Sequence, residues 1–166
     1  MEIKNFKRIA FQVNLLGALY TISPTLLMKY RYLIHKGSLP NLKNPKTFDE
    51  KLIWLNSYWR HPLKTLCGDK YMMRAYVEKH GLGHILTPLL GVYQNAEEIN
   101  FENLPQRFVL KCSHGCGYNI ICTDRKNFDI EGSKRKLKKW LSEDFSRLYG
   151  EMRYSGMKPK IISEVF

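Results

Sequence analysis

The stretch FVLKCSHGCGYNIICTD, residues 108–124, decides the fold that we expect for the C-terminal half of this chain. RFVLKCSH and YNIICTD have the composition of β-strands, and the turn between them contains two glycines, so the stretch predicts a β-hairpin. A lysine, a histidine and cysteines lie in or beside the turn. Three interpretations are open: an ordinary hairpin, a metal site and a phosphate-binding turn.

A metal site in this hairpin would draw its ligands from Cys112, His114, Cys116 and Cys122. Structural zinc usually takes paired ligands from two separate knuckles, whereas these four lie on one hairpin with irregular gaps. Strand alternation also turns Cys112 to the same side as Phe108 and Leu110, as expected for a small buried hydrophobe. A catalytic thiol beside His114 would need a third group to orient it, and none is recognisable. We therefore expect neither a metal ligand nor a catalytic residue here.

A phosphate-binding turn fits the glycines better. Backbone N–H groups of Ser113–Gly117 can converge on an anion, because glycine reaches the dihedral angles that such a nest needs and lets a ligand approach closely. Lys111 faces away from Cys112 and would add a positive charge to a polyphosphate site. One glycine-rich hairpin is weak evidence, however, and taken alone the stretch is an ordinary hairpin by default.

The residues after the hairpin complete a mixed pattern. FDIEGSKRKLKKWLSEDF, residues 128–145, predicts a helix, and KPKIISEVF, residues 158–166, predicts a third strand. The order strand, glycine turn, strand, helix, strand indicates an α+β fold. Because the chain ends on an apolar strand without a polar tail, we expect it to be cut from a longer protein.

The N-terminal half predicts helices. A first helix is expected from about Ile3 to Leu19, and a second from Pro24 to about His35, since Ser23 is a suitable N-cap. Residues 9–28 carry no formal charge, but polar residues and the Ser-Pro break favour helices packed on the domain over a membrane-spanning helix. A basic amphipathic segment resting on a membrane surface is the alternative.

Two further helices are expected before the hairpin. Thr47 and Glu50 form a capping-box pattern that opens a helix through KLIWLNSYW, in which three large residues fall at helical spacing and are expected in the core: Trp54, Leu55 and Tyr58. GDKYMMRAYVEKHG, residues 68–81, predicts another, with its buried face drawn from Tyr71, Met72, Ala75 and Tyr76. HILTPLLGVYQ, residues 84–94, is expected to form a short strand, a turn and an extended segment.

The charge balance indicates an anionic partner. The chain carries 27 Lys and Arg against 15 Asp and Glu, for a formal net charge of +12. Nucleic acid, an acidic membrane surface, nucleotide phosphates and a charged polymer all meet this condition. Four cysteines in a chain of 166 residues without a signal peptide are typical of reduced cytosolic thiols, which indicates a cytoplasmic protein.

Three segments resemble, in the right order, the nucleotide-binding parts of the ATP-grasp superfamily. GDKYMMRAYVEKHGL with HILTP resembles the segment in which an Asp-Lys pair begins a helix that ends in glycine. FVLKCSHGCGYNII resembles the lysine-bearing strand and glycine-rich loop, and KIISEVF the strand that leads into the adenine hinge. With LKNPKTFDEKLIWLNSYWRHPL and PLLGVYQNAEEINFENLPQRF, the motifs are similar to the TupA-like ATP-grasp family over roughly residues 38–166.

This resemblance implies a nucleotide site and an activity. Lys70 and Lys111 would hold phosphate oxygens of ATP, Gly115 and Gly117 would shape the loop that closes over them, and Glu164 would accept a hydrogen bond from the adenine amino group. In simpler interpretations Lys70 is a solvated helix residue and Glu164 a strand-edge charge. Full-length relatives would join a carboxylate to an amine through an acyl phosphate, in teichuronopeptide or other cell-surface polymer synthesis.

The resemblance also implies that part of the site is missing. The glycine loop is sparser than in the better known carboxylases, and the larger subdomain with its magnesium ligands would follow the hinge. We therefore expect a helical extension over 1–37, a helical pre-ATP-grasp region over 38–106 and the small ATP-grasp subdomain over 107–166. ATP is the expected cofactor, Mg²⁺ only with the missing subdomain, and the truncated chain is expected to be inactive.

Two other functions are alternatives to ATP binding. The family is often labelled glycosyltransferase, but no Asp-x-Asp triplet of the kind that binds a sugar nucleotide through a metal occurs in the chain. KRKLKKW, residues 134–140, suggests nucleic-acid binding, yet its spacing is typical of the solvated face of a helix packed on a sheet. The expected partners are a nucleotide and, as alternatives, an anionic membrane surface at the inner face of the membrane or a surface-polymer precursor.

Overall fold

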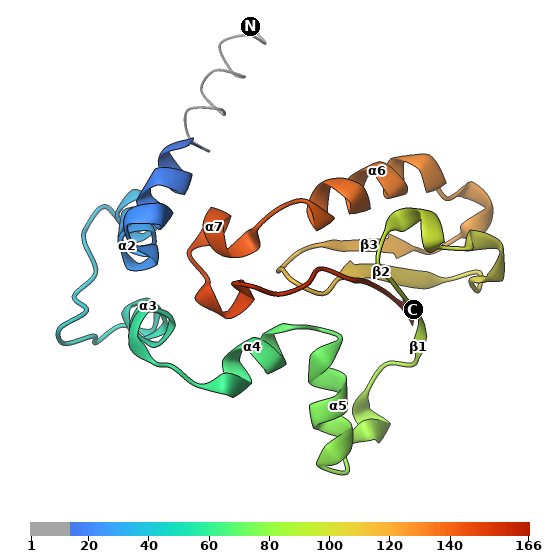
Figure 1. Ribbon diagram of the computed structural model, residues 1–166, viewed down its shortest axis with the longest axis horizontal. Coiled ribbons are helices and arrows are strands. Elements are labelled where there is room, and N and C mark those ends of the chain that lie inside the picture. Colours follow the sequence, from blue (N-terminus) through green and yellow to red (C-terminus); the bar gives the residue numbers. More distant parts are fainter. Residues whose placement is uncertain (1–13) are drawn as a thin grey trace, which may run out of the picture. The chain divides into compact units, whose positions relative to one another are not determined.

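The computed structural model describes residues 14–166, which divide into two compact units (Figure 1). Unit 1 comprises the described residues up to His61 together with Asp144–Ser155. Unit 2 comprises Pro62–Glu143 together with Gly156–Phe166. Residues 14–22 are helical, and the remainder of the first predicted helix, from Ile3, lies outside the described residues. The domain boundaries predicted after residues 37 and 106 stay predictions.

Unit 1 is helical: α2 (Pro24–Lys36), α3 (Phe48–Tyr58), α7 (Phe145–Tyr149) and η5 (Met152–Tyr154). Each of these elements contributes a buried apolar side chain, and the loop before α3 adds one more: Leu27, Ile53, Phe145, Tyr154 and Leu42. Phe145 meets Tyr154 edge to face, with ring centroids 4.9 Å apart. Segments far apart in the sequence therefore share one core in this unit.

The predicted ends of α2 and α3 are confirmed. Pro24 occupies the first turn of α2, and Gly37 closes the helix with φ 74°, a left-handed conformation that favours glycine. Thr47 and Glu50 form both hydrogen bonds of the capping box that opens α3. Local chemistry in the sequence was sufficient to place these helix ends.

Unit 2 is mixed. Its helices are α4 (Pro62–Gly68), α5 (Met72–Lys79) and α6 (Ile130–Leu141), and its strands are β1 (Leu89–Tyr93), β2 (Phe108–Cys112), β3 (Asn119–Cys122) and β4 (Ile161–Val165). Short 3₁₀ turns lie between them: η1 (Gly83–Ile85), η2 (Ala96–Glu98), η3 (Phe101–Asn103) and η4 (Arg125–Asn127). The predicted α+β fold, its hairpin, the helix after it and the last strand are confirmed.

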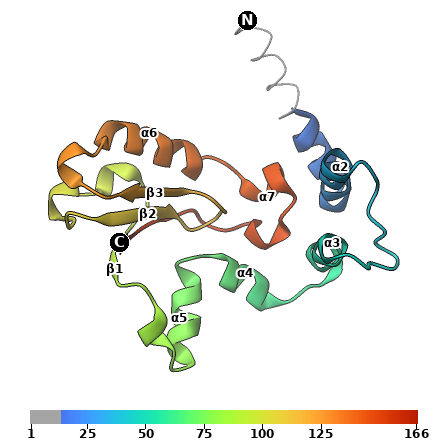
Figure 2. The same ribbon diagram turned by 180° about the vertical axis from the view of Figure 1, so that it is seen from behind.

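The four strands form one antiparallel sheet in the order β1-β4-β2-β3. Val109 pairs with Glu164 and Lys111 with Ile162, and directly paired residues project to the same face of a sheet. Val109, Lys111 and Glu164 therefore share one face. The other face carries Phe108, Leu110, Cys112 and Ile161, all fully buried. Figures 1 and 2 show α6 along one side of the β2–β3 hairpin and α5 on the other.

Three expectations about helix faces and elements were wrong. Trp54, Leu55 and Tyr58 are 38%, 40% and 51% exposed, so they do not form the core of α3. No residue of α5 is buried, although one face of it was expected to be. Residues 83–85 form a 3₁₀ turn in place of a strand, and α4 and α7 were not predicted. Helical spacing shows which residues share a face, but not which face another element covers.

The described part of the chain, residues 14–166, contains no helix that is long and apolar enough to cross a membrane.

Candidate functional site

An aspartate and a lysine at the start of α5 hold the β2–β3 turn. The Asp69 carboxylate accepts hydrogen bonds from the backbone N–H groups of Tyr71 and Met72, and its second oxygen accepts one from the Ser113 hydroxyl at 3.1 Å. The Lys70 ammonium donates to the carbonyl oxygen of Cys112 at 3.0 Å and to that of Gly115. The Lys70 backbone N–H also donates to the Ser113 carbonyl at 3.2 Å. The Asp-Lys pair is thus part of the turn's structure.

Two cations share the carboxylate at the end of the chain. Lys111 Nζ lies 2.5 Å from Glu164 Oε2, and the Arg74 guanidinium lies 3.0 Å from Glu164 Oε1. Arg74 also donates to the Thr87 carbonyl at 2.8 Å. Glu164 is almost fully buried, so a carboxylate without these partners would be strongly destabilising there. α5, β2 and β4 therefore meet at one charged cluster on the face of the sheet opposite Phe108.

The far side of the β2–β3 turn is bound to the end of α6. His114 Nε2 lies 3.0 Å from the Trp140 carbonyl, and the Tyr118 hydroxyl donates to Glu143 at 2.5 Å. The Tyr118 and Trp140 rings stack with centroids 5.1 Å apart. Both sides of the turn are therefore held by other segments of unit 2.

The two glycines of the turn differ. Gly117 is exposed and has φ 77°, which an L-residue adopts only with strain, and a Cβ placed there would meet no atom within 4 Å. Gly115 is buried, its carbonyl oxygen accepts a hydrogen bond from the Lys70 ammonium, and it is not among the described glycines with positive φ. The conformational need for glycine therefore applies to Gly117, and open space for a ligand lies beside it.

Burial changes the acidity of three side chains near the turn. It lowers the pKa of the Lys70 ammonium, and the neighbouring Lys111 charge acts in the same direction. Burial raises the pKa of the Cys112 thiol to about 12 and lowers the pKa of His114. At neutral pH Cys112 is therefore a protonated thiol and His114 is uncharged, as expected of structural residues.

An apolar cavity adjoins the charged cluster. It has a volume of about 690 Å³ and lies along α4 and α5, with Arg74 and Leu89 among its lining residues. Leu89 pairs with Glu164 in the sheet, so the cavity opens beside the buried carboxylate. Tyr71, Met72 and Ala75 supply apolar lining, and these are residues that had been expected in the core. A cavity of this volume is in the range of small-molecule sites.

The charges of this cluster fit an anion such as a polyphosphate. Lys70, Arg74 and Lys111 are three cations against the two carboxylates Asp69 and Glu164, which leaves one net positive charge. Within residues 14–166, no three His, Cys, Asp or Glu side chains gather closely enough to hold a metal. Both carboxylates already have protein donors as partners.

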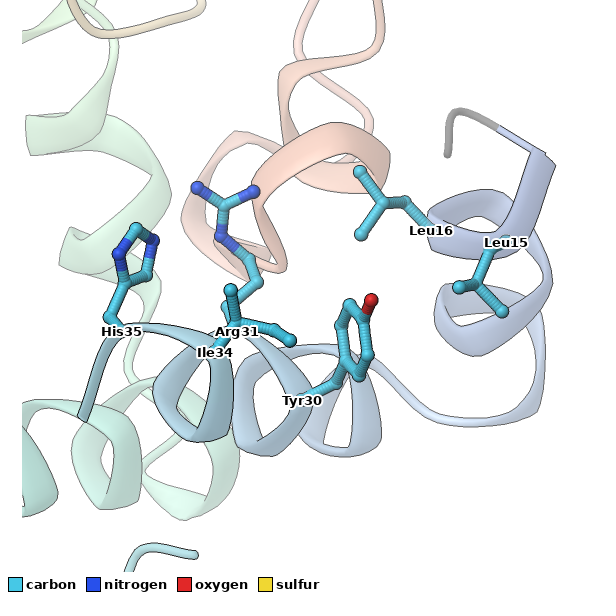
Figure 3. Close-up of a pocket in the computed structure, with 6 residues that line it drawn as sticks. All are labelled: Leu15, Leu16, Tyr30, Arg31, Ile34 and His35. Carbon is cyan, nitrogen blue, oxygen red and sulfur yellow. The ribbon is translucent and has the colours of Figure 1, made fainter. Parts of the chain in front are cut away.

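A second cavity, in unit 1, contains none of the predicted nucleotide contacts. Figure 3 shows Tyr30, Arg31 and His35 rising from α2, with Leu16 directed toward them from the helical residues 14–22. Its volume is about 210 Å³, and Arg31 is already occupied by the Tyr149 ring, whose centroid lies 4.9 Å away. Among the described residues that line it there is no carboxylate.

The sequence identified most of this cluster but not all of it. Lys70, Lys111, Gly115 and Glu164 come together with the β2–β3 turn, although their proposed roles toward ATP stay predictions. Arg74 was missed: it lies in α5, whereas Lys70 precedes that helix, and no pattern in the sequence marked it as a partner of Glu164.

Comparison with known proteins gave one match. The family model described as TupA-like ATPgrasp matches residues 50–165, which is most of the chain. No curated protein and no solved structure matches.

Proposed function

The chain belongs to the TupA-like ATP-grasp family, and from this membership we propose that it binds ATP on the sheet of unit 2, as part of a carboxylate–amine ligase of cell-surface polymer synthesis. The observation that carries the proposal is the cluster in which Lys111 and Arg74 bind Glu164 while Lys70 binds the β2–β3 turn.

The phosphates would lie against the β2–β3 turn. Lys111 is the most accessible member of the ion-paired cluster, with 30% of its side chain exposed, and it can turn toward an anion while Arg74 keeps Glu164 neutralised. The open space beside Gly117 lets a phosphate approach the backbone of the turn. Lys70 would contribute its charge from below the turn, where it already holds two carbonyl oxygens.

The adenine would lie in the apolar cavity beside Glu164. Purine rings need apolar surface and a few placed polar groups, and the cavity along α4 and α5 supplies both. Each oxygen of Glu164 already has one cationic partner, but a carboxylate oxygen has a second lone pair for the adenine amino group. Mg²⁺, where it accompanies ATP, would neutralise phosphate charge for transfer.

The wider role follows from the family alone. We place the protein in teichuronopeptide or related polysaccharide synthesis, in the cytoplasm and peripheral to the inner face of the membrane. The net charge of +12 supports a location beside anionic lipids or an anionic polymer precursor.

The test is calorimetric titration of the whole chain with ATP, with and without Mg²⁺. We expect saturable binding that Lys111→Ala weakens by about tenfold or more, because a charge-assisted contact to phosphate is lost. Lys136→Ala is the matched control, since Lys136 is an exposed lysine of α6 outside the cluster. It should leave the affinity unchanged.

Two results would overturn the nucleotide assignment. One is the absence of ATP binding by a chain that is folded by circular dichroism. The other is equal ATP affinity of Lys111→Ala and the unaltered protein. Arg74→Ala offers a further check, because it leaves Glu164 with Lys111 as its one ion-pair partner and should hold Lys111 away from the phosphates.

A further inference from the structure

Helix α3 presents its apolar side to solvent. Its buried residues are Glu50, Ile53 and Ser57, of which two are polar. Phe48 is 74% exposed, Leu52 41% and Tyr58 51%. At 100° per residue, Trp54, Tyr58, Lys51, Leu55, Phe48 and Leu52 follow one another around a single arc. We call this arc the α3 face.

Glu50 is the local reason why α3 turns its apolar side to solvent. Its carboxylate accepts backbone N–H groups of Asn41, Lys46 and Thr47, at 2.8, 3.0 and 3.0 Å. These bonds draw the loop before α3 over the side of the helix that carries Glu50. The opposite side, which holds the aromatic residues, is left outward. Large exposed apolar patches usually mark an interaction site.

The charges around the α3 face are of one sign. Lys51 is the one charged residue on the arc, and Lys43, Lys46 and Arg60 are exposed just before and after the helix. Asp49 is paired with Lys36 at 2.9 Å, and the Glu50 carboxylate is buried. The described residues of unit 1 hold nine Lys and Arg against four Asp and Glu, a net +5. α3 therefore has no unpaired carboxylate that would repel an anionic surface.

Exposed apolar side chains surrounded by positive charge distinguish among the possible binding partners of the α3 face. A second copy of the chain would bring the same positive charge to the contact, which is repulsive. Single-stranded nucleic acid needs a basic groove lined by stacking rings, whereas the α3 face is a convex helix surface with aliphatic as well as aromatic residues. Trp and Tyr beside Lys on an amphipathic helix are typical of segments that lie in the interface of a bilayer.

We infer that the α3 face docks unit 1 onto an anionic phospholipid surface, with Phe48, Trp54 and Tyr58 entering the interface and Lys51 meeting lipid phosphates. The inference rests on the peripheral location proposed above and is independent of ATP binding. It assigns that location to α3, whereas the sequence suggested residues 1–37.

The test is flotation of the whole chain with vesicles of equal parts phosphatidylglycerol and phosphatidylcholine. Phe48→Ser with Tyr58→Ser should weaken binding by about tenfold or more, because apolar area no longer leaves water. Lys51→Glu should weaken it by roughly 25-fold, since one charge near an anionic surface is worth roughly a factor of five and the reversal changes two charges. Ile85→Ser and Lys136→Glu are the matched controls, exposed residues of unit 2 that should change nothing.

Tryptophan fluorescence supplies a second measurement that does not depend on affinity. Vesicles with brominated acyl chains should quench the protein, and Trp54→Phe should lose more of this quenching than Trp140→Phe, because Trp140 is stacked on Tyr118 in unit 2. Equal loss in the two variants would overturn the inference.

The other outcomes are also decisive. If vesicles bind but the α3 variants bind equally well, the peripheral location survives and the α3 face is the wrong surface. If vesicles do not bind and the α3 variants abolish self-association or RNA binding, the occupant is a second copy or a nucleic acid. None of these results bears on the ATP titration, which uses no lipid.

Discussion

Helices α6 and α3 are similar in length but turn opposite faces to solvent. α6 has 12 residues, buries Leu137 completely and exposes lysines and an arginine. α3 has 11 residues, buries Glu50 and Ser57 and exposes Phe48, Trp54 and Tyr58. The amphipathic rule describes α6, which packs on the sheet. It fails for α3 because hydrogen bonds from a loop, and not an apolar partner, cover one side of that helix.

The largest effect should come from the core contact of α6. Leu137→Ala should lower the free energy of unfolding by about 2–5 kcal/mol, because a fully buried leucine leaves a cavity. Urea denaturation followed by circular dichroism measures this loss. A loss below about 1 kcal/mol would mean that α6 is held by its polar contacts, and the contrast with α3 would disappear.

Removal of the N-cap side chain should lower the free energy of unfolding by similar amounts in α6 and α3. Asp129 accepts a hydrogen bond from the Gly132 N–H at 2.8 Å, and Thr47 accepts one from the Glu50 N–H at 3.2 Å. Asp129→Ala and Thr47→Ala should each cost about 1 kcal/mol of unfolding free energy. Serine at either position should restore most of the loss. A cost confined to α6 would show that α3 does not depend on its capping box.

Acid should weaken the α3 region through Glu50. Three backbone N–H groups lower the pKa of this carboxyl from its ordinary value of 4.5 to about 2. Its contribution to stability is therefore complete above pH 4.5 and is lost as the pH falls toward 2. Glu50→Gln should flatten the dependence of stability on pH in this window, as measured by urea midpoints. An unchanged pH profile would contradict the role of Glu50 as the clamp of the loop.

The smallest effect on stability should come from the α3 face. Phe48→Ser removes a side chain that is 74% exposed, so the free energy of unfolding should change by no more than about 0.5 kcal/mol. Combined with Tyr58→Ser, the same substitution should weaken binding to vesicles. A large loss of stability would mean that Phe48 packs against protein and is no docking residue.

Sequence reasoning succeeded where the deciding interactions are local. Thr47 with Glu50, Pro24 with Gly37, and the glycine-containing turn after Lys111 each mark an element end within a few residues. The order of motifs also identified the family, because a family is itself a pattern along the chain. The sequence likewise brought Lys70, Lys111 and Glu164 into one hypothesis before any contact among them was known.

It failed where the deciding contacts are distant in sequence. Nothing near Arg74 indicates that its guanidinium meets a carboxylate 90 residues later, and nothing in α5 indicates that its apolar residues line a cavity. The spacing of Trp54 and Tyr58 predicted a shared face correctly but the wrong environment for it, because the partner that covers a helix comes from tertiary structure.

The sequence by itself determined the helix ends, the hairpin, the α+β class and the family, because these depend on side chains within a few residues of one another or on their order. Only the tertiary structure decided that Glu164 is shared by Arg74 and Lys111, that Lys70 holds the β2–β3 turn, and that α3 faces outward. Each of these depends on which surfaces are taken out of water. Burial is a property of the packed chain that local periodicity does not contain.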